Sequence, residues 1–331
     1  MKVCVYGAGA VGSLVASRLM QAGRAEVSVV ARGEHLRAIA AHGLRLVSAE
    51  GESVSRPAVA TDRPRELPPQ DIVFVTLKAM SQPACAADIA ALIKPGGHAV
   101  FANNGIPWWW KHGRAGEAPL PLVDTGEALW NTVAPQRALA CVIYSSSEVT
   151  APGVVLHRGN NRWLLGEPAG MTSARLDGTV ALMRACGFAA EACADIRREV
   201  WGKLLRNVPV NPICALTRLP IDGVAADAEL AGMVLGLMDE VVRIAAAQGS
   251  DISGELEANR AWFANGGGRE GAPLSGVRPS MLQDVLAGRR IEVEAILGQV
   301  QLLARESGTP CPVLDGLVPL VRALDRGLAR G

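Results

Sequence analysis

Three polar side chains recur at helical spacing in the second half of the chain: Lys203, Asn207 and Asn211. Residues four apart share one face of a helix, so these side chains would form a row. A lysine and two amides among apolar neighbours are costly to bury unless they meet a polar group. A partly desolvated lysine can also release a proton, which an arginine does not readily do. The pattern predicts a row that meets a polar ligand and transfers a proton.

The choice of basic residue supports this interpretation. Only five of the 33 basic residues are lysines, so lysine is not the default cation of this chain. The alternative is structural: Lys203 pairs with an acid such as Glu199 on the exposed side, and the asparagines are caps near the helix end. The row taken by itself leaves both interpretations open.

A glycine-rich turn near the N-terminus offers a second kind of chemistry. The turn is Gly7-Ala8-Gly9-Ala10-Val11-Gly12, between the apolar run 3–6 and a helical pattern that extends to Met20, with a second apolar run at 27–31. A G-x-G-x-x-G binds a dinucleotide in this strand–turn–helix–strand context. Its glycines permit the tight turn, the approach of a pyrophosphate to the backbone, and close helix–strand packing. We expect this turn to hold phosphates at a helix N-terminus.

The residue after the second strand predicts which dinucleotide binds. An NAD site places Asp or Glu roughly 20 residues beyond the glycines, on the ribose 2′-hydroxyl. This chain has Arg32 there, followed by Gly33. A planar guanidinium suits a 2′-phosphate, which favours NADPH/NADP. The alternative for Arg32 is a solvated surface arginine.

The elements that must position these residues differ between the two halves of the chain. The first half alternates short apolar runs with helical patterns, typical of a parallel sheet covered on both faces. Strands are predicted at 71–77 and 98–102, and near 121–124, 139–147, 153–157 and 163–166. Ligands of such sheets bind beyond the carboxyl ends of the strands. Lys78 and Asn104 follow two of these strands, so we expect them on one rim with the glycine turn and Arg32.

From about residue 172 onward, long helical patterns dominate: 173–186, 195–207, 227–248, 252–264 and 279–306. The glycine-rich segment 265–271 interrupts them and is predicted to be a flexible loop. We therefore predict an α/β fold with a Rossmann-type doubly wound parallel sheet over residues 1–171, which binds NADP. An all-α C-terminal domain over 172–331 follows it.

The composition excludes several classes of protein. The net charge of +1 gives no long-range field that would attract nucleic acid or an anionic membrane. No apolar run approaches the roughly 18 residues of a membrane span, and nothing resembles a secretory signal. Seven cysteines without a C-x-x-C pair and five scattered histidines argue against a disulfide framework or a metal site. We expect a cytoplasmic protein.

Further motifs join the glycine turn and Arg32: Thr76-Leu-Lys-Ala79, Asn104-Gly105, Trp201-Gly-Lys-Leu-Leu-Arg-Asn207 with Asn211-Pro212, Ser280-Met-Leu-Gln-Asp284 and Gly288-Arg-Arg-Ile-Glu292. Together they run nearly from end to end, and the chain resembles the ketopantoate reductases (2-dehydropantoate 2-reductases). The resemblance implies an NADP-dependent oxidoreductase of pantothenate and coenzyme A biosynthesis. It also implies a Rossmann-type domain followed by a helical domain that holds the substrate and catalyses the reaction.

The implied reaction is reduction of ketopantoate to pantoate, with hydride delivered by NADPH to the 2-oxo carbon. The resemblance makes Lys203 the proton donor. It makes Asn207, Asn211 and Ser280 the contacts to the substrate carboxylate and hydroxyl.

Three further residues receive cofactor roles from the resemblance. Asn104 would contact both cofactor and substrate. Glu292 would reach the nicotinamide end of the cofactor and help to orient Lys203, while Lys78 would lie near the adenine-ribose side.

Three features depart from the family pattern. Trp108-Trp109-Trp110 follow Asn104-Gly105, Val277 stands where some members have an asparagine, and Pro220-Ile221-Asp222 replaces a further asparagine. Three consecutive tryptophans cannot all point one way, so we expect one to face the cleft or a partner; the alternative is a packed or dimer-buried loop. Pro209 also predicts a kink in its helix. These changes would suit a bulkier 2-oxo acid.

Two rival functions stay open. One is an NADPH-dependent reductase of a different, bulkier 2-oxo acid on the same scaffold, and the other is a non-catalytic NADP-binding redox sensor. A sensor needs only the nucleotide site, so the presence of Lys203 and Glu292 argues against it. A homodimer would suit the tryptophans and the C-terminal helices, but the sequence does not decide the oligomeric state.

Overall fold

The computed structural model describes residues 1–268 and 276–330, which divide into two compact units. The first unit comprises Met1–Asn103 and Pro107–Ile196, and the second comprises Asn104–Ile106 and Arg197–Gly331. Of the predicted loop 265–271, residues 269–271 lie outside the described residues.

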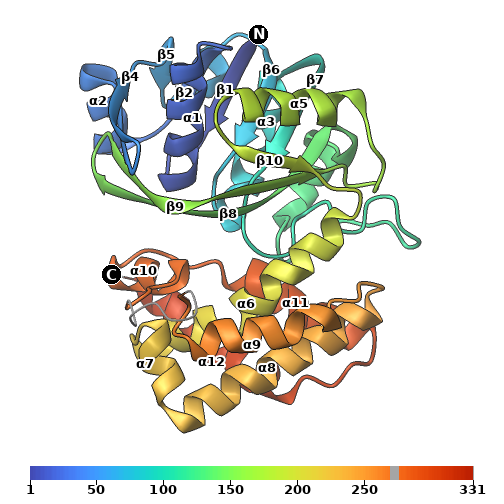
Figure 1. The fold of residues 1–331 in the computed structure, drawn as a ribbon. Coiled ribbons are helices and arrows are strands. Elements are labelled where there is room, and N and C mark those ends of the chain that lie inside the picture. The colour runs from blue at the N-terminus through green and yellow to red at the C-terminus, as the bar shows by residue number, and fades with distance from the viewer. Residues whose placement is uncertain (269–275, 331) are drawn as a thin grey trace. The chain divides into compact units, whose positions relative to one another are not determined.

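A mixed but mainly parallel sheet forms the first unit (Figure 1). Its described strands are β1 (Lys2–Tyr6), β2 (Glu26–Val30), β3 (Leu44–Ser48), β4 (Gly51–Ser55), β5 (Val59–Thr61), β6 (Gln70–Val75), β7 (Ile93–Phe101), β8 (Ala138–Ala151), β9 (Val154–Gly166) and β10 (Ala189–Ala192). Their order is β4-β3-β9-β8-β7-β6-β1-β2-β5, and β10 pairs with β9. The β3–β4 and β8–β9 pairs are antiparallel, which the sequence did not predict. The Rossmann-type α/β prediction is confirmed.

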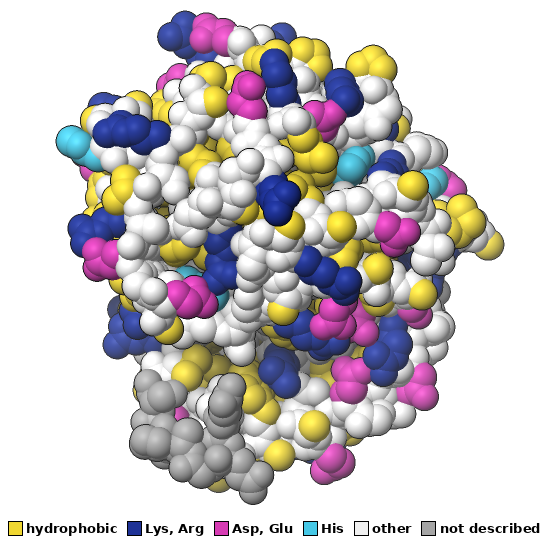
Figure 2. All heavy atoms as spheres, turned by 45° about the horizontal axis from the view of Figure 1, so that its top comes forward, with side chains coloured by type: hydrophobic (Ala, Val, Ile, Leu, Met, Phe, Trp, Pro, Cys, Tyr) yellow, Lys and Arg dark blue, Asp and Glu magenta, His cyan; other side chains and the backbone are white. Residues whose placement is uncertain are grey.

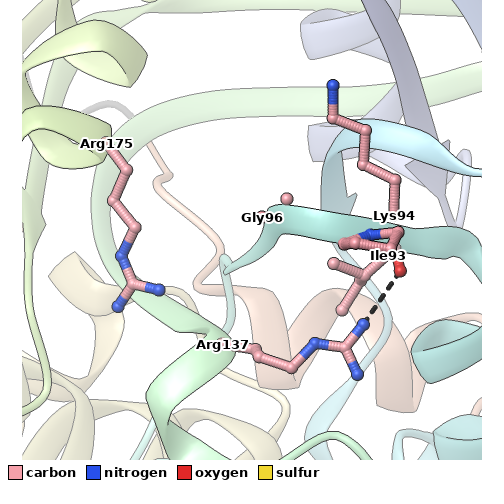
Figure 3. A pocket seen from close by; sticks show the side chains of 7 residues that line it. Ile93, Lys94, Gly96, Arg137 and Arg175 are labelled. Atoms are coloured by element: carbon pink, nitrogen blue, oxygen red, sulfur yellow. Dashed lines mark hydrogen bonds between the residues drawn. The ribbon is translucent and has the colours of Figure 1, made fainter.

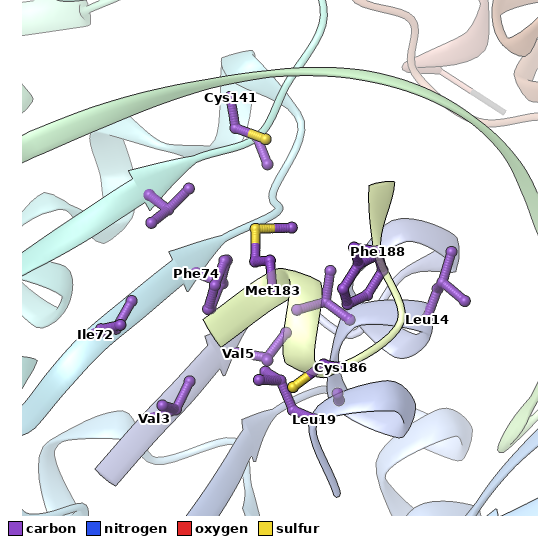
Figure 4. Close-up of a cluster of buried hydrophobic side chains, with 14 of the residues drawn as sticks. Val3, Val5, Leu14, Leu19, Ile72, Phe74, Cys141, Met183, Cys186 and Phe188 are labelled. Atoms are coloured by element: carbon purple, nitrogen blue, oxygen red, sulfur yellow. The ribbon is translucent and has the colours of Figure 1, made fainter. Parts of the chain in front are cut away.

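The helices of the first unit pack on this sheet, except that the short α4 packs on α3. They are α1 (Ala10–Ala22), α2 (Gly33–His42), α3 (Ala86–Leu92), α4 (Ala128–Thr132) and α5 (Ala174–Ala185). Leu14 and Leu19 of α1 are fully buried in one cluster with Phe74 of β6 (Figure 4). Burial of such a side chain contributes about 1.5–3 kcal/mol.

The first unit extends beyond the predicted boundary at 171/172. Met183 of α5 and Phe188 belong to the same buried cluster as Leu14. Residues 189–192 form β10, which pairs with residues 162–165 of β9. The segment after residue 172 therefore completes the sheet and its core, and the division falls at Ile196.

The strand predicted near 121–124 is wrong. Val123 N–H donates to Leu120 O in a turn, and Asp124 is buried. The Asp124 carboxylate accepts from Leu129 N–H at 2.8 Å and Trp130 N–H at 2.9 Å. It thus binds free N–H groups in the first turn of α4.

The second unit is helical, as predicted (Figure 1). Its described helices are α6 (Ile196–Thr217), α7 (Ile221–Ala226), α8 (Ala228–Ala247), α9 (Leu256–Ala264), α10 (Ser280–Leu286), a π-helical turn (Glu294–Gly298), α11 (Gln299–Glu306) and α12 (Pro312–Leu328). The single helix predicted at 279–306 is therefore divided, because the chain leaves α10 at Gly288 with a φ of 65°. Helix α12 was not predicted.

The surface agrees with the near-neutral composition. On the face shown in Figure 2, basic and acidic side chains are interspersed among apolar ones. Over residues 1–268 and 276–330, none of the helices combines the length and apolarity that a bilayer crossing requires.

Candidate active site

The glycine turn is anchored between three parallel strands. Tyr6 at the end of β1 pairs in register with Val30 of β2 and Val75 of β6. Gly7 has a φ of 104°, a conformation that L side chains rarely adopt. Its N–H and that of Ala8 donate to Val30 O at 3.0 and 3.1 Å. The turn is therefore held against the carboxyl end of β2.

The other two glycines of the motif have different surroundings. A Cβ on Gly12 would lie 2.3 Å from Gly7 O and 2.5 Å from Thr76 Oγ1, so only glycine permits this packing. A Cβ on Gly9 would meet nothing within 4 Å. Gly9 is also the N-cap of α1, with no side-chain cap and no acidic residue in the first helical turn. The open N–H groups and positive end of the helix dipole suit a phosphate.

Two basic residues follow the neighbouring strands. Arg32 is the exposed N-cap of α2, directly beyond β2. Lys78 is half-buried beyond β6, at the start of a single 3-10 turn. Since β1, β2 and β6 are adjacent and parallel, these residues and the glycine turn lie at one edge of the sheet.

His35 in α2 is a residue that sequence reasoning missed. Gly153 N–H donates to His35 Nδ1 at 3.0 Å, and His35 Nε2 lies 3.2 Å from Ser13 Oγ. Ser13 Oγ in turn donates to Ala8 O at 3.1 Å within the glycine turn. Burial lowers the pKa of His35, which favours the neutral ring that this chain of hydrogen bonds requires. No local pattern reveals His35, because its partner Gly153 is 118 residues away.

A hollow of about 580 Å³ lies at the other end of the sheet, beside the start of β7 (Figure 3). Its cations already have partners: Arg137 donates to Ile93 O at 2.9 Å, and Arg175 forms an ion pair with Glu167. Lys94 pairs with Asp71. This hollow is therefore not the candidate active site.

In the second unit, α6 carries the predicted polar row. Lys203 and Asn207 are half-buried, whereas Asn211 is 4% exposed. In the described part of the chain, Asn211 Nδ2 has no hydrogen-bond partner. The helix continues through Pro209 and Pro212 to Thr217, so the interpretation of the two asparagines as caps near its end is wrong.

The structure also brings Asn104 and Glu292 together. Asn104 Nδ2 lies 3.5 Å from Glu292 Oε2, a long contact. The backbone before Glu292 is fixed by Asp325 of α12, which accepts from Ile291 N–H at 2.9 Å and from Arg290 Nε at 2.8 Å. Asp325 is a second residue that sequence reasoning missed.

Ser280, the remaining predicted substrate contact, is the exposed first residue of α10. The predicted site residues thus form a set at the sheet edge of the first unit and a set in the second unit that comprises the α6 row, Asn104 with Glu292, and Ser280.

Comparisons with known proteins agree over almost the whole chain. Residues 3–170 match the model of the ketopantoate reductase PanE/ApbA family, and residues 195–325 match the model of its C-terminal domain. The chain belongs to the ketopantoate reductase family.

Individual relatives support the assignment. A 2-dehydropantoate 2-reductase from Mesorhizobium japonicum is 38% identical over 99% of both chains. A crystal structure from Ralstonia solanacearum MolK2, provisionally described as a ketopantoate reductase, has a TM-score of 0.89 at 33% identity and covers 98% of both chains. D-mandelate dehydrogenase, solved with NADH and anilino(oxo)acetate, shares the fold with a TM-score of 0.83 at 21% identity, covering 99% of this chain and 100% of that one. The family implies a nicotinamide cofactor and a small keto acid substrate.

The residues that depart from the family pattern lie in packed or hydrogen-bonded positions. Trp108, Trp109 and Trp110 are at most 1% exposed, and Trp108 packs edge-on against Phe101 at 5.2 Å. This burial favours the alternative of a packed loop. Val277 O accepts from Ile221 N–H at 3.0 Å, so two of the departing positions are in contact.

Proposed function

We propose that this chain reduces 2-dehydropantoate to pantoate with NADPH, on the route to pantothenate and coenzyme A. The observation that carries the proposal is the buried Asn211 amide, whose Nδ2 has no partner in the described residues. An unsatisfied buried N–H costs about 1–3 kcal/mol. A carboxylate or hydroxyl of a bound 2-oxo acid would supply the missing acceptor. Membership of the family and the name of the 38% identical relative support the choice of acid.

The first unit is proposed to hold the cofactor. The glycine turn and the uncapped N-terminus of α1 would bind its pyrophosphate. Arg32 would bind the 2′-phosphate, which supports NADPH over NADH, and Lys78 would lie near the adenine ribose. When bound, the cofactor supplies the hydride that the 2-oxo carbon receives.

The second unit is proposed to hold the substrate and to manage its proton. As negative charge develops on the ketone oxygen, Lys203 Nζ would donate a proton to it, which contributes roughly 10²–10⁴ in rate. Asn207, Asn211 and Ser280 would bind the carboxylate and hydroxyl of the acid. The position of Lys203 supports this role, since it is half-buried and lies on the same face of α6 as Asn207 and Asn211.

Two residues are proposed to act at the nicotinamide end. Asn104 would contact cofactor and substrate, and the Glu292 carboxylate would orient Lys203. Their 3.5 Å contact supports a joint role, because displacement of one side chain would disturb the other.

A second candidate is reduction of a bulkier 2-oxo acid, favoured by Val277 in place of an amide. NADPH oxidation by the purified protein, with ketopantoate beside a panel of 2-oxo acids and NADH as control cofactor, distinguishes the functions. Turnover of ketopantoate with NADPH supports the proposal, and turnover of another acid only supports the second candidate. Tight NADPH binding without any turnover would support a redox sensor. A homodimer stays a prediction for light scattering to test, and the three buried tryptophans no longer favour it.

A further inference from the structure

The helix that follows Glu292 begins with a π-helical turn, Glu294–Gly298. In an α-helix, the N–H of Gln299 would donate to the carbonyl of Ala295, four residues earlier. Here it donates to Glu294 O, five residues earlier. This shift moves a helical donor away from Ala295 O, and Ile106 N–H donates to that oxygen at 2.8 Å. Single π-helical turns of this kind recur at functional sites.

Gly105 makes this approach possible. Its φ is 85°, and a Cβ there would lie 2.4 Å from Ala295 O and 2.8 Å from Ala295 Cβ. Any side chain at position 105 would therefore collide with the turn. The backbone of 104–106 rests directly on the π-helical turn because residue 105 is glycine.

Helix α12 braces the turn from another direction. Arg322 donates from Nε and Nη2 to the two carboxylate oxygens of Glu294, at 2.7 and 2.6 Å. Such bidentate pairs fix geometry as well as contributing energy. Asp325, one helical turn further along α12, holds Ile291 N–H immediately before Glu292. The backbone is thus tied to α12 on both sides of Glu292.

We propose that the π-helical turn, braced by Arg322, is a seat for Gly105 and Ile106 that positions Asn104 and Glu292 for hydride transfer. Gly105 and Arg322 are positioning residues in this proposal, which rests on the proposed reductase function. The seat sets the place of Asn104 through one backbone hydrogen bond and one close approach, while the same turn begins two residues after Glu292. A shift of the seat would move both side chains.

The test compares Gly105→Ala with Gly116→Ala. Gly116 also has a positive φ, 73°, but a Cβ there would meet nothing within 4 Å, so it controls for the conformational cost of alanine. We expect kcat/KM for the 2-oxo acid to fall roughly 10²-fold in Gly105→Ala, as for a displacement of about 1 Å at a reacting centre. Gly116→Ala should match the wild type. Binding of 2′,5′-ADP, which probes Arg32 and the phosphate turn, should be unchanged in both variants and reports an intact first unit.

A second pair keeps the test decisive if Gly105→Ala fails to fold. Arg322→Ala removes the brace, and we expect kcat/KM to fall about tenfold, the effect of roughly 1.4 kcal/mol. Arg322→Lys should restore part of that loss. A wild-type kcat/KM in Gly105→Ala, or in Arg322→Ala, would refute the proposal that the π-helical turn positions Asn104 and Glu292. If the wild type itself turns over no 2-oxo acid, the proposed function fails and this inference falls with it.

Discussion

Asn211→Ala should make the protein more stable and less active. The Nδ2 group of Asn211 is buried without a partner in the described residues, which costs about 1–3 kcal/mol in the free protein. Alanine removes this cost and favours the helix, but it gives up the contacts of about one carbon, roughly 0.8 kcal/mol. The net effect is a stabilisation of about 1 kcal/mol. Such a gain raises the melting temperature by roughly 2–4 °C.

The same substitution removes a donor to the proposed substrate. A hydrogen bond to a charged group is worth about 1.5–3 kcal/mol, so kcat/KM for the 2-oxo acid should fall roughly 10- to 150-fold. The assays are scanning calorimetry of the unliganded protein and steady-state oxidation of NADPH. Opposite changes in stability and activity are expected wherever a polar group is kept for a ligand at the expense of the fold.

Asn207→Ala is the matched control. Asn207 lies one helical turn earlier on α6 and is only half-buried. The same substitution there removes no buried amide that lacks a hydrogen-bond partner, so it should not gain the corresponding free energy. Its melting temperature should rise less than that of Asn211→Ala. A melting temperature for Asn211→Ala at or below that of Asn207→Ala would refute the buried-amide reasoning. An unchanged kcat/KM in Asn211→Ala would remove Asn211 from the substrate site.

Three further predictions concern Lys203, Arg32 and His98. Lys203→Ala should lower kcat roughly 10²–10⁴-fold without changing 2′,5′-ADP binding, and Lys203→Arg should not rescue it, because arginine retains its proton; an unchanged kcat would exclude Lys203 as the proton donor. Arg32→Glu should raise the KM for NADPH roughly 10²-fold and shift preference toward NADH, whereas an unchanged ratio of the two kcat/KM values would show that Arg32 does not read the 2′-phosphate. Burial lowers the pKa of His98 from 6.5 to about 4, so between these pH values the unfolded chain binds a proton that the folded protein does not. The free energy of unfolding should therefore be highest above about pH 6.5 and fall by about 3 kcal/mol toward pH 4. His98→Gln should flatten that loss in melts between pH 7 and pH 4, and an unchanged slope would assign the acid sensitivity to other groups.

Local sequence patterns predicted those parts of the fold that depend on interactions between residues close together in the chain. The glycine motif predicted β1, α1 and β2, because a tight turn and a helix N-terminus depend on neighbouring residues. In contrast, β10 has the sequence Ala-Ala-Glu-Ala, with no strand-forming residue. It is a strand because residues 162–165 of β9 offer it backbone partners, and no window around residue 190 contains that information.

Helix α12 differs from β10, since its signal is present in the sequence. Leu314, Leu317, Val318 and Val321 are buried and recur at the spacing of one helical face. Gly316, Pro319 and Gly327 interrupt the pattern and weaken its helix propensity. Once formed, α12 supplies Arg322 and Asp325 to a segment about 30 residues earlier, and pairing of this kind depends on tertiary packing.

Glycines 7, 12 and 105 show why one half of the candidate site was easier to predict than the other. A Cβ on each of them would collide with a neighbouring group. The group is Leu77 for Gly7, the carbonyl oxygen of Gly7 for Gly12, and the carbonyl oxygen of Ala295 for Gly105. Gly7 and Gly12 are five residues apart and form one motif, whereas Gly105 and Ala295 are separated by more than half of the chain. The physical requirement is the same in both places, but only the first has a short-range signature. The role of Gly105 therefore becomes visible only when the π-helical turn is seen beneath it.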